Sequence, residues 1–434
     1  MSEYNNIYIK RFFILLSSTG EIVCERQYKH ASDGDNHGEN DHAMDNAILA
    51  SFASSANNFM KYVMESSISN NLMSKHKGGN SNASNKNSAN NNNNNNNNNN
   101  EIGNDNDINE FSFNNDIYSF LRIGDHILVA QSGKGVGRYI ASQRLYGMRG
   151  MLLLLFGDPK NWTEDRFELD GLENIIDHFL ASSNLSFLLN GTRHVPLKRK
   201  ATDQVKRLIA SFENNPIVHY TLITLGQSVL CSTLPANYTR LIAEMLIVRP
   251  LGAIVSTTTP IYVNGTWMQL VITRFRAFHV AVVTNIDSRR ELTSALKTFE
   301  EKFHDATKLL PTEEPPILLR HYANYNTAAF ALVKESTGVA VVPELRDGPG
   351  DEKKRINRIF QWFFCRVKDM KEGGFMNVTI SNNIYVFHAM RYHGCDIYAL
   401  FSDKVESNDM IRMCKEIVEA AQTKHMLLQT ANTK

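Results

Sequence analysis

The chain has 434 residues, enough for two to four domains, and its 46 Lys and Arg against 45 Asp and Glu residues give no overall electrostatic field toward nucleic acid or a membrane. Five scattered cysteines without a C-x-x-C motif argue against a disulfide framework or a zinc knuckle and favour a reducing cytosol. The longest uncharged apolar run, residues 151–156, is far shorter than the ~20 residues that span a bilayer, so we expect a soluble chain that touches membranes only peripherally.

Two strands and a helix open the chain. Residues 7–16 and 21–26 flank a Ser-Ser-Thr-Gly turn and predict a hairpin. Residues 44–65 carry apolar side chains at helical spacing and predict an amphipathic helix packed on the sheet of this hairpin. Residues 66–109 include an unbroken asparagine run and have almost no side chains to bury. We expect a disordered insertion in a surface loop; a role in aggregation or partner binding is the alternative.

Strands and helices continue after the insertion. Residues 117–123 alternate as a strand, 126–130 form a second short apolar run, and a helix follows. One face of this helix carries apolar residues at i, i+4, i+7, i+11 and i+14, namely Ala141, Leu145, Met148, Leu152 and Leu155. A further short helix is predicted at 172–180.

The same order of elements then returns twice. After a helix at 201–212, the second round has strands at 217–223, 228–232, 261–263, 266–273 and 278–284, with helices at 235–248 and 289–309. The dipeptide Asn264-Gly265 is its clearest hairpin signal. The third round has strands at 317–322, 328–333, 375–380, 384–390 and 395–401, a loop at 334–349, and helices at 351–367 and 409–428.

A hairpin, a helix, a three-strand meander and a closing helix make an α+β arrangement, in which an antiparallel sheet is covered by helices. We therefore expect a first domain at 1–185, interrupted by the insertion at 66–109, a helical linker at 186–214, a second domain at 215–311 and a third at 316–430. Each domain is expected to hold one five-stranded sheet.

The glycines of Gly133-Lys134-Gly135-Val136-Gly137 stand between a strand and a helix, as in phosphate-binding loops. Their G-x-G-x-G spacing fits neither G-x-x-x-x-G-K-[ST] nor G-x-G-x-x-G, and the neighbouring strands form a hairpin. We favour a flexible corner over a nucleotide site, and we expect no cofactor.

The densest basic cluster consists of Lys198, Arg199, Lys200, Lys206 and Arg207. A solvated helix face is the simplest interpretation, and contact with anionic lipids is the functional one. A nucleic-acid patch is less favoured because no aromatic residues are interleaved.

No catalytic constellation is visible. The histidines do not pair at metal-ligand spacing, and no G-x-S-x-G context accompanies a serine, so we expect neither a metal site nor an enzyme. Two stretches are candidates for a partner interface. The first is a strand that would expose its edge, namely Ile127, Leu128, Val129 and Ala130. The second is the apolar surplus of the following helix, with Leu152 and Leu155; helix core is its default interpretation.

Four stretches support a family resemblance by their order along the chain: 10–26, 127–130 before Leu145-Tyr146-Gly147, 192–197 and 318–322. They resemble the opening hairpin, the second half of the first domain, the Arg-x-x-Pro-Leu linker and the start of the third domain of the tandem longin-domain family. This family contains the Mon subunit of the Mon–Ccz complex, the planar-polarity protein Fuzzy and a Hermansky–Pudlak subunit. The last two stretches are most similar to the Mon subunit.

The resemblance implies three longin-like domains and a subunit of a guanine-nucleotide exchange factor. It implies a Ccz-like triple-longin partner and, as client, a late-endosomal Rab GTPase of the Rab-seven class. The expected place is the cytoplasm and the surface of late endosomes or vacuoles, in vesicle transport and vacuole fusion. The alternative is a non-catalytic longin scaffold, such as a Fuzzy-like effector in planar polarity and ciliogenesis.

Overall fold

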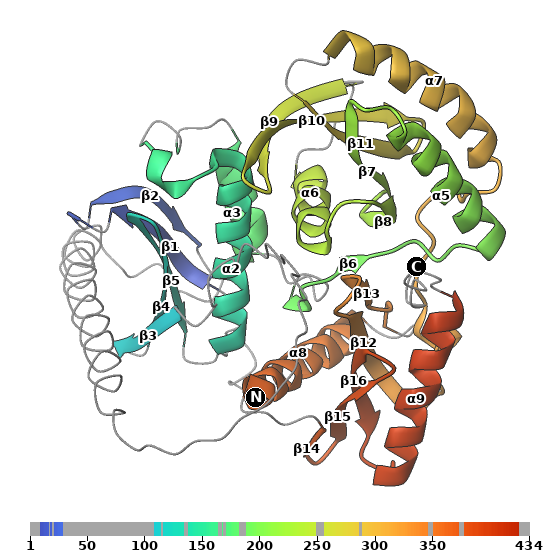
Figure 1. Cartoon of the computed structure of the whole chain (residues 1–434). Helices are drawn as coiled ribbons and strands as arrows, with labels where there is room; N and C mark the ends of the chain where they lie inside the picture. The colour runs from blue at the N-terminus through green and yellow to red at the C-terminus, as the bar shows by residue number, and fades with distance from the viewer. Residues whose placement is uncertain are drawn as a thin grey trace, which may run out of the picture.

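Three sheets and the helices that cover them make up the computed structural model of the chain (Figure 1). The fold is α+β, as the sequence predicts. The structure describes residues 9–16, 18–19, 21–28, 108–113, 116–133, 138–163, 167, 171–181, 188–248, 256–285, 289–345, 350–372 and 377–424. The helix predicted at 44–65 and nearly all of the insertion predicted at 66–109 lie outside these residues.

The first sheet joins the opening hairpin to a three-strand meander. Its strands are β1 (Ile9–Leu16), β2 (Ile22–Gln27), β3 (Ile108–Phe113), β4 (Asp116–Ile123) and β5 (His126–Gly133). They lie in the order β2-β1-β5-β4-β3, so β5 is central and pairs with both β1 and β4. Strand β3 was not predicted. The sequence patterns assigned residues 108 and 109 to the insertion and indicated no strand at 110–113.

The second sheet has the same order of strands. It consists of β7 (Val218–Leu225), β8 (Ser228–Ser232), β9 (Ser256–Val263), β10 (Thr266–Phe275) and β11 (Phe278–Thr284), arranged β8-β7-β11-β10-β9. The predicted hairpin at Asn264-Gly265 is confirmed, because it joins β9 to β10. Both turn residues have positive φ, 50° and 81°, as a two-residue hairpin turn requires.

The third sheet repeats this order and adds a strand. It consists of β12 (Thr327–Lys334), β13 (Val339–Val341), β14 (Val378–Ser381), β15 (Tyr385–Tyr392) and β16 (Cys395–Ser402), arranged β14-β15-β16-β12-β13. The short strand β6 (Thr192–Arg193) pairs with β13 in parallel, so this sheet has six strands where five were expected.

Two predictions in the third unit were wrong. Strand β13 lies within the loop predicted at 334–349; its three residues are too few for an alternating pattern to stand out. The strand predicted at 317–322 contains instead the 3₁₀ turn η4 (Leu319–His321). The His321 amide donates to the Leu318 carbonyl at 3.0 Å, so this turn satisfies its own backbone locally.

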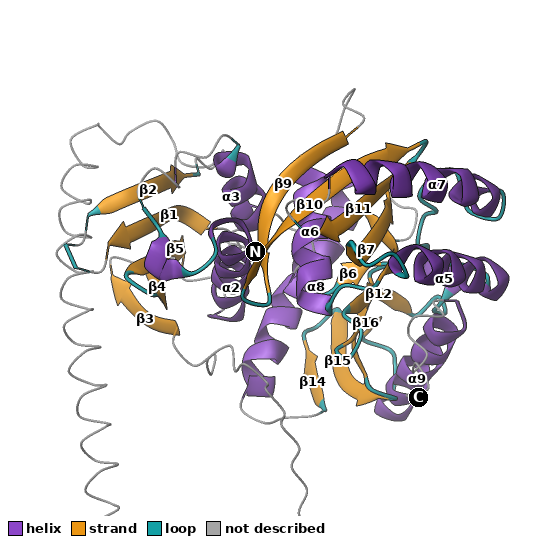
Figure 2. Ribbon diagram, turned by 45° about the horizontal axis from the view of Figure 1, so that its top comes forward, coloured by secondary structure: helices purple, strands orange, loops and turns teal. Residues whose placement is uncertain are grey.

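Seven described α-helices cover the sheets: α2 (Arg138–Phe156), α3 (Leu172–Ala181), α5 (Arg199–Glu213), α6 (Ala236–Val248), α7 (Arg289–Thr307), α8 (Gly350–Glu372) and α9 (Ser407–Lys424). Figures 1 and 2 show α2, α6 and α8 between the three sheets, whereas α5, α7 and α9 lie on the outside. In the second and third units the inner helix joins the second and third strands. In the first unit the inner helices, α2 and α3, follow the fifth strand instead.

Helix α2 is the common element of this arrangement. It contacts β4 and β5 of its own sheet, β9 of the second sheet, and helices α3, α6 and α8. Leu145, Met148, Met151 and Leu152 have no exposed surface. They belong to one apolar cluster that also contains side chains from all three sheets. The three units therefore share a continuous core.

Polar contacts reinforce the same junction. His178 on α3 and the buried Glu244 on α6 are linked at 2.6 Å, from imidazole Nε2 to carboxylate Oε2. The Lys368 ammonium on α8 lies 5.2 Å from the ring centre of Tyr139 on α2 and 5.0 Å from that of Tyr398 on β16. These contacts tie the first unit to the second and to the third.

The segment predicted as a helical linker connects the second and third sheets. The Thr192 amide donates to the Gly338 carbonyl at 2.7 Å, and the Val195 amide donates to the Val229 carbonyl at 2.9 Å. Helix α5, which follows, packs on α7 and β7 and contributes Val205, Ile209 and Phe212 to the outer core of the second unit.

The other face of the first sheet carries a separate apolar cluster. Its members are buried side chains of β1, β4 and β5, namely Phe13, Leu15, Tyr118, Phe120, Ile127 and Val129. In the part of the chain that the structure describes, all residues of this cluster, and the one packed against it, are in strands. The helix predicted to pack on this sheet is outside the described residues.

A substitution at Gly157 tests the contact between the first and second units. Its φ is +74°, and a Cβ atom there would lie 2.7 Å from Cζ2 of Trp267 on β10. We expect Gly157→Ala to lower the free energy of unfolding by about 2–4 kcal/mol, because backbone strain adds to this clash. Urea denaturation followed by circular dichroism measures the change.

Gly265 is the matched control, because its φ is +81° but a Cβ atom there meets nothing within 4 Å. Gly265→Ala should therefore cost only the backbone strain, about 1–2 kcal/mol. Equal losses for the two variants would show that the packing of Gly157 against Trp267 does not stabilise the junction.

Candidate functional site

The structure contradicts the prediction of a free sheet edge at residues 127–130. Ile127, Leu128, Val129 and Ala130 lie in the middle of β5 and pair with β1 on one side and β4 on the other. None of the four is more than 1% exposed. An apolar run marks a buried strand, but it does not tell a central strand from an edge strand.

The apolar surplus of α2 is also internal. Leu152 has no exposed surface, and Leu155 is 5% exposed. Both belong to the core shared by the three units. The default interpretation as helix core holds for these two residues, and the partners of the helix are other parts of the same chain.

The basic cluster, in contrast, lies on the surface. Lys198 precedes α5, and Arg199, Lys200, Lys206 and Arg207 project from it; all five are exposed. At 100° per residue, the four on α5 fall within about a third of the circumference of the helix, opposite Val205 and Ile209. Arg199 lies 4.0 Å from Asp203, and this is the one ion pair of the five within the described residues. The structure thus gathers four of the predicted residues on one solvent-facing side.

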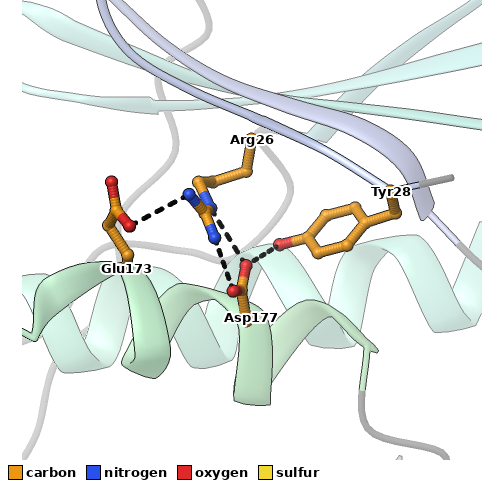
Figure 3. Close-up of polar contacts among 4 residues, drawn as sticks. All are labelled: Arg26, Tyr28, Glu173 and Asp177. Atoms are coloured by element: carbon orange, nitrogen blue, oxygen red, sulfur yellow. Dashed lines mark hydrogen bonds and ion pairs between the residues drawn. The ribbon is translucent and has the colours of Figure 1, made fainter.

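A polar cluster that the sequence did not indicate joins β2 to α3 (Figure 3). Arg26 donates from Nε to Oδ1 of Asp177 at 3.0 Å and from Nη2 to Oδ2 at 2.6 Å. Its Nη1 lies 3.1 Å from Oε2 of Glu173. The Tyr28 hydroxyl donates to Oδ1 of Asp177 at 2.9 Å.

These contacts shift the ionisation of the cluster. The hydrogen bonds to Asp177 raise the pKa of Arg26, and burial together with the Asp177 carboxylate raises the pKa of Tyr28. Arg26 stays charged and Tyr28 stays neutral, so neither is poised to exchange a proton near neutral pH. The arrangement is a bidentate clamp that holds an edge strand on a helix. Arg26 ends the hairpin stretch of the family resemblance, but its partners lie about 150 residues away in sequence.

Burial also shifts the pKa values of three further groups in the first unit. Burial raises the pKa of the Cys24 thiol to about 11 and lowers the pKa of the fully buried Arg144 to about 10. Burial lowers the pKa of His126, which lies 5.3 Å from the ring centre of Trp162. A protonated thiol and a neutral, ring-packed imidazole serve packing.

No group of three His, Cys, Asp or Glu side chains within the described ranges could hold a metal ion. The glycine-rich corner at 134–137 is outside those ranges. None of the described helices is long and apolar enough to cross a membrane.

Comparisons with known proteins give no assignment. No protein-family model matches the chain, and no curated protein sequence matches it.

We predict that the Arg26 clamp contributes to stability. Asp177→Asn removes the charge that Nε and Nη2 of Arg26 contact, so it should lower the free energy of unfolding by about 1–3 kcal/mol. Glu173→Gln should cost less than about 0.5 kcal/mol, because the Glu173 carboxylate is 72% exposed. Urea denaturation of both variants checks this, and equal losses would show that the bidentate contact is not the stabilising one.

Proposed function

We propose that this chain is a subunit of a guanine-nucleotide exchange factor for a late-endosomal Rab GTPase of the Rab-seven class. The observation that carries the proposal is the strand order. Three sheets in succession place the first strand of a hairpin beside the last strand of a meander, as β1 lies beside β5, β7 beside β11 and β12 beside β16. Three α+β units with one strand order are what the resemblance to the tandem longin-domain family implies for the Mon subunit.

In this proposal the chain works through binding and not through chemistry. An exchange factor accelerates nucleotide release by binding the nucleotide-free GTPase more tightly than the loaded one. It supplies a preformed surface, and no acid, base or metal is required of it. A rigid platform suits this task, because a surface that holds its shape spends little binding energy on its own ordering. The core shared by the three units supports such rigidity. A Ccz-like triple-longin protein would complete the platform.

The same proposal places the complex peripherally on late endosomes or vacuoles. Lys198, Arg199, Lys200, Lys206 and Arg207 are the candidate contacts with anionic lipids. Each basic side chain close to an anionic membrane surface gains on the order of 1 kcal/mol, so the four cations on one side of α5, together with Lys198 before it, could hold a protein weakly and in a salt-dependent way.

One experiment tests both parts. The chain is purified with a co-expressed Ccz-like partner, and release of a fluorescent guanine nucleotide from a Rab-seven-class GTPase is followed in solution and on phosphatidylserine vesicles. We expect the complex to accelerate release in both settings. With Lys198, Arg199 and Lys200 changed to Glu, release in solution should be unchanged, whereas the additional acceleration on vesicles should be lost in low salt.

Each part can fail separately. A stable complex that leaves nucleotide release at the intrinsic rate rules out the exchange function and favours a non-catalytic scaffold. A triple Glu variant that matches the unmodified chain on vesicles rules out the lipid contact at this face.

A further inference from the structure

A groove of about 450 Å³ runs between the packed helices α5 and α7 on the outer side of the second unit. Figures 1 and 2 show the two helices side by side on the outside of the second sheet. Four residues from the C-terminal end of α5 and its cap region and six from α7 line the groove: Leu208, Ser211, Phe212, Asn215, Glu291, Ser294, Ala295, Thr298, Phe299 and Lys302.

The floor of the groove is apolar and firmly held. Phe212 and Phe299 are 7% and 2% exposed, with ring centres 4.5 Å apart, and Phe299 stacks on Phe303. Leu208 and Ala295 are half-buried beside them. These side chains are fixed by the outer core of the second unit, so the groove does not depend on a mobile loop.

Small uncharged side chains border the groove, and two basic side chains lie at one end of it. Ser211, Ser294 and Thr298 are small and uncharged, which lets another backbone come close. Lys302 lines the groove, and Arg207 lies one helical turn before Ser211 on the same side of α5. Within the described ranges neither cation forms an ion pair, and both are exposed. The one acidic lining residue, Glu291, is 11 residues from Lys302, roughly 16 Å along the helix axis.

We propose that this groove binds an acidic amphipathic helix of a partner protein. A furrow between two packed helices accepts the side-chain ridge of a third, and the 291–302 span matches about three turns. The apolar face of that helix would cover Leu208, Phe212 and Ala295, and its flanking carboxylates would pair with Arg207 and Lys302. This binding site goes beyond the exchange function proposed above and does not depend on it.

A membrane is the other candidate for this side of the molecule. A bilayer surface would meet the exposed cations Lys198, Arg199, Lys200, Lys206 and Arg207 without entering the groove. A peptide helix bound in the groove would contact both the apolar floor of the groove and the two cations, Arg207 and Lys302. The groove therefore favours a peptide over a membrane as its ligand.

The probe is a fluorescein-labelled peptide of about 18 residues, long enough to populate a helix, with leucines on one face at i, i+4, i+7 and i+11 and glutamates beside them. Its matched control replaces the glutamates by lysines. Fluorescence anisotropy with the full chain should show saturable binding of the acidic peptide and at least about tenfold weaker binding of the basic one.

Two groove variants and one matched control locate the site. Ala295→Trp fills the furrow and should weaken binding of the acidic peptide by at least about tenfold. Arg207→Glu with Lys302→Glu should weaken it by about tenfold, because two attractions become repulsions. Lys206→Glu with Lys297→Glu makes the same change of net charge on the same two helices. Lys297 does not line the groove, and Lys206 lies about 100° farther around α5 from the groove residue Ser211 than Arg207 does, so this variant should bind within about twofold of the unmodified chain. Circular dichroism confirms that each variant is folded.

Three results would overturn the proposal. The first is equal binding of the acidic and the basic peptide, and the second is binding of the acidic peptide by the groove variants as tight as by the unmodified chain. The third is that the chain binds neither peptide, while the groove variants no longer bind phosphatidylserine vesicles. Nucleotide release measured on the same preparations separates this proposal from the exchange function. A chain complex that binds the acidic peptide but leaves nucleotide release unchanged would contradict the exchange function alone.

Discussion

Helix α2 is buried on almost every side, and the arrangement of the three units depends on it. Thirteen of its 19 residues are buried and Arg138 alone is exposed, so the helix cannot be a surface element of one domain. Its own sheet covers part of it, and β9, α6 and α8 cover the rest. Burying a large apolar side chain contributes about 1.5–3 kcal/mol. Exposing the side of α2 that faces the other units would therefore cost more free energy than the typical free energy of unfolding of a domain. The first unit therefore lacks a complete surface of its own, and its described part shares one core with the other two units.

This constraint gives the first unit a different orientation from the other two. All three sheets have the same strand order, but the first packs on the centre through the helices that follow its fifth strand. The second and third pack through the helix that joins their second and third strands. The inner surfaces of the three units therefore differ in which helices each unit turns toward the junction. The outer helices α5, α7 and α9 are then left to face solvent, and α5 and α7 present the cations and the groove.

The sequence predicted the positions of helices and strands better than it predicted which of them pack against one another. Alternating and helical periods located most strands and helices, and Asn264-Gly265 located a hairpin, because these signals are local. Strand β13 was missed because three residues are too few for a pattern, and β3 because it borders the low-complexity segment. The apolar residues of β5 were candidates for a partner interface, and those of α2 were predicted as helix core by default, with a partner interface as the alternative. Periodicity reports that a side chain is buried, but not whether its neighbour belongs to the same chain. For the same reason, the pairing of Arg26 with Asp177 and the junction of α5 and α7 were not predicted, whereas the exposed cations of α5 were.

Hydrogen exchange followed by mass spectrometry tests most directly whether α2 joins the three units. Leu152→Ala opens a cavity in the middle of α2 and should cost about 2–5 kcal/mol. We expect amides of β11 and β16, in the second and third sheets, to exchange faster together with those of β5. Val418→Ala, in α9 and outside the shared core, should act mainly on the third unit. Faster exchange confined to the first unit in the Leu152→Ala variant would contradict the account.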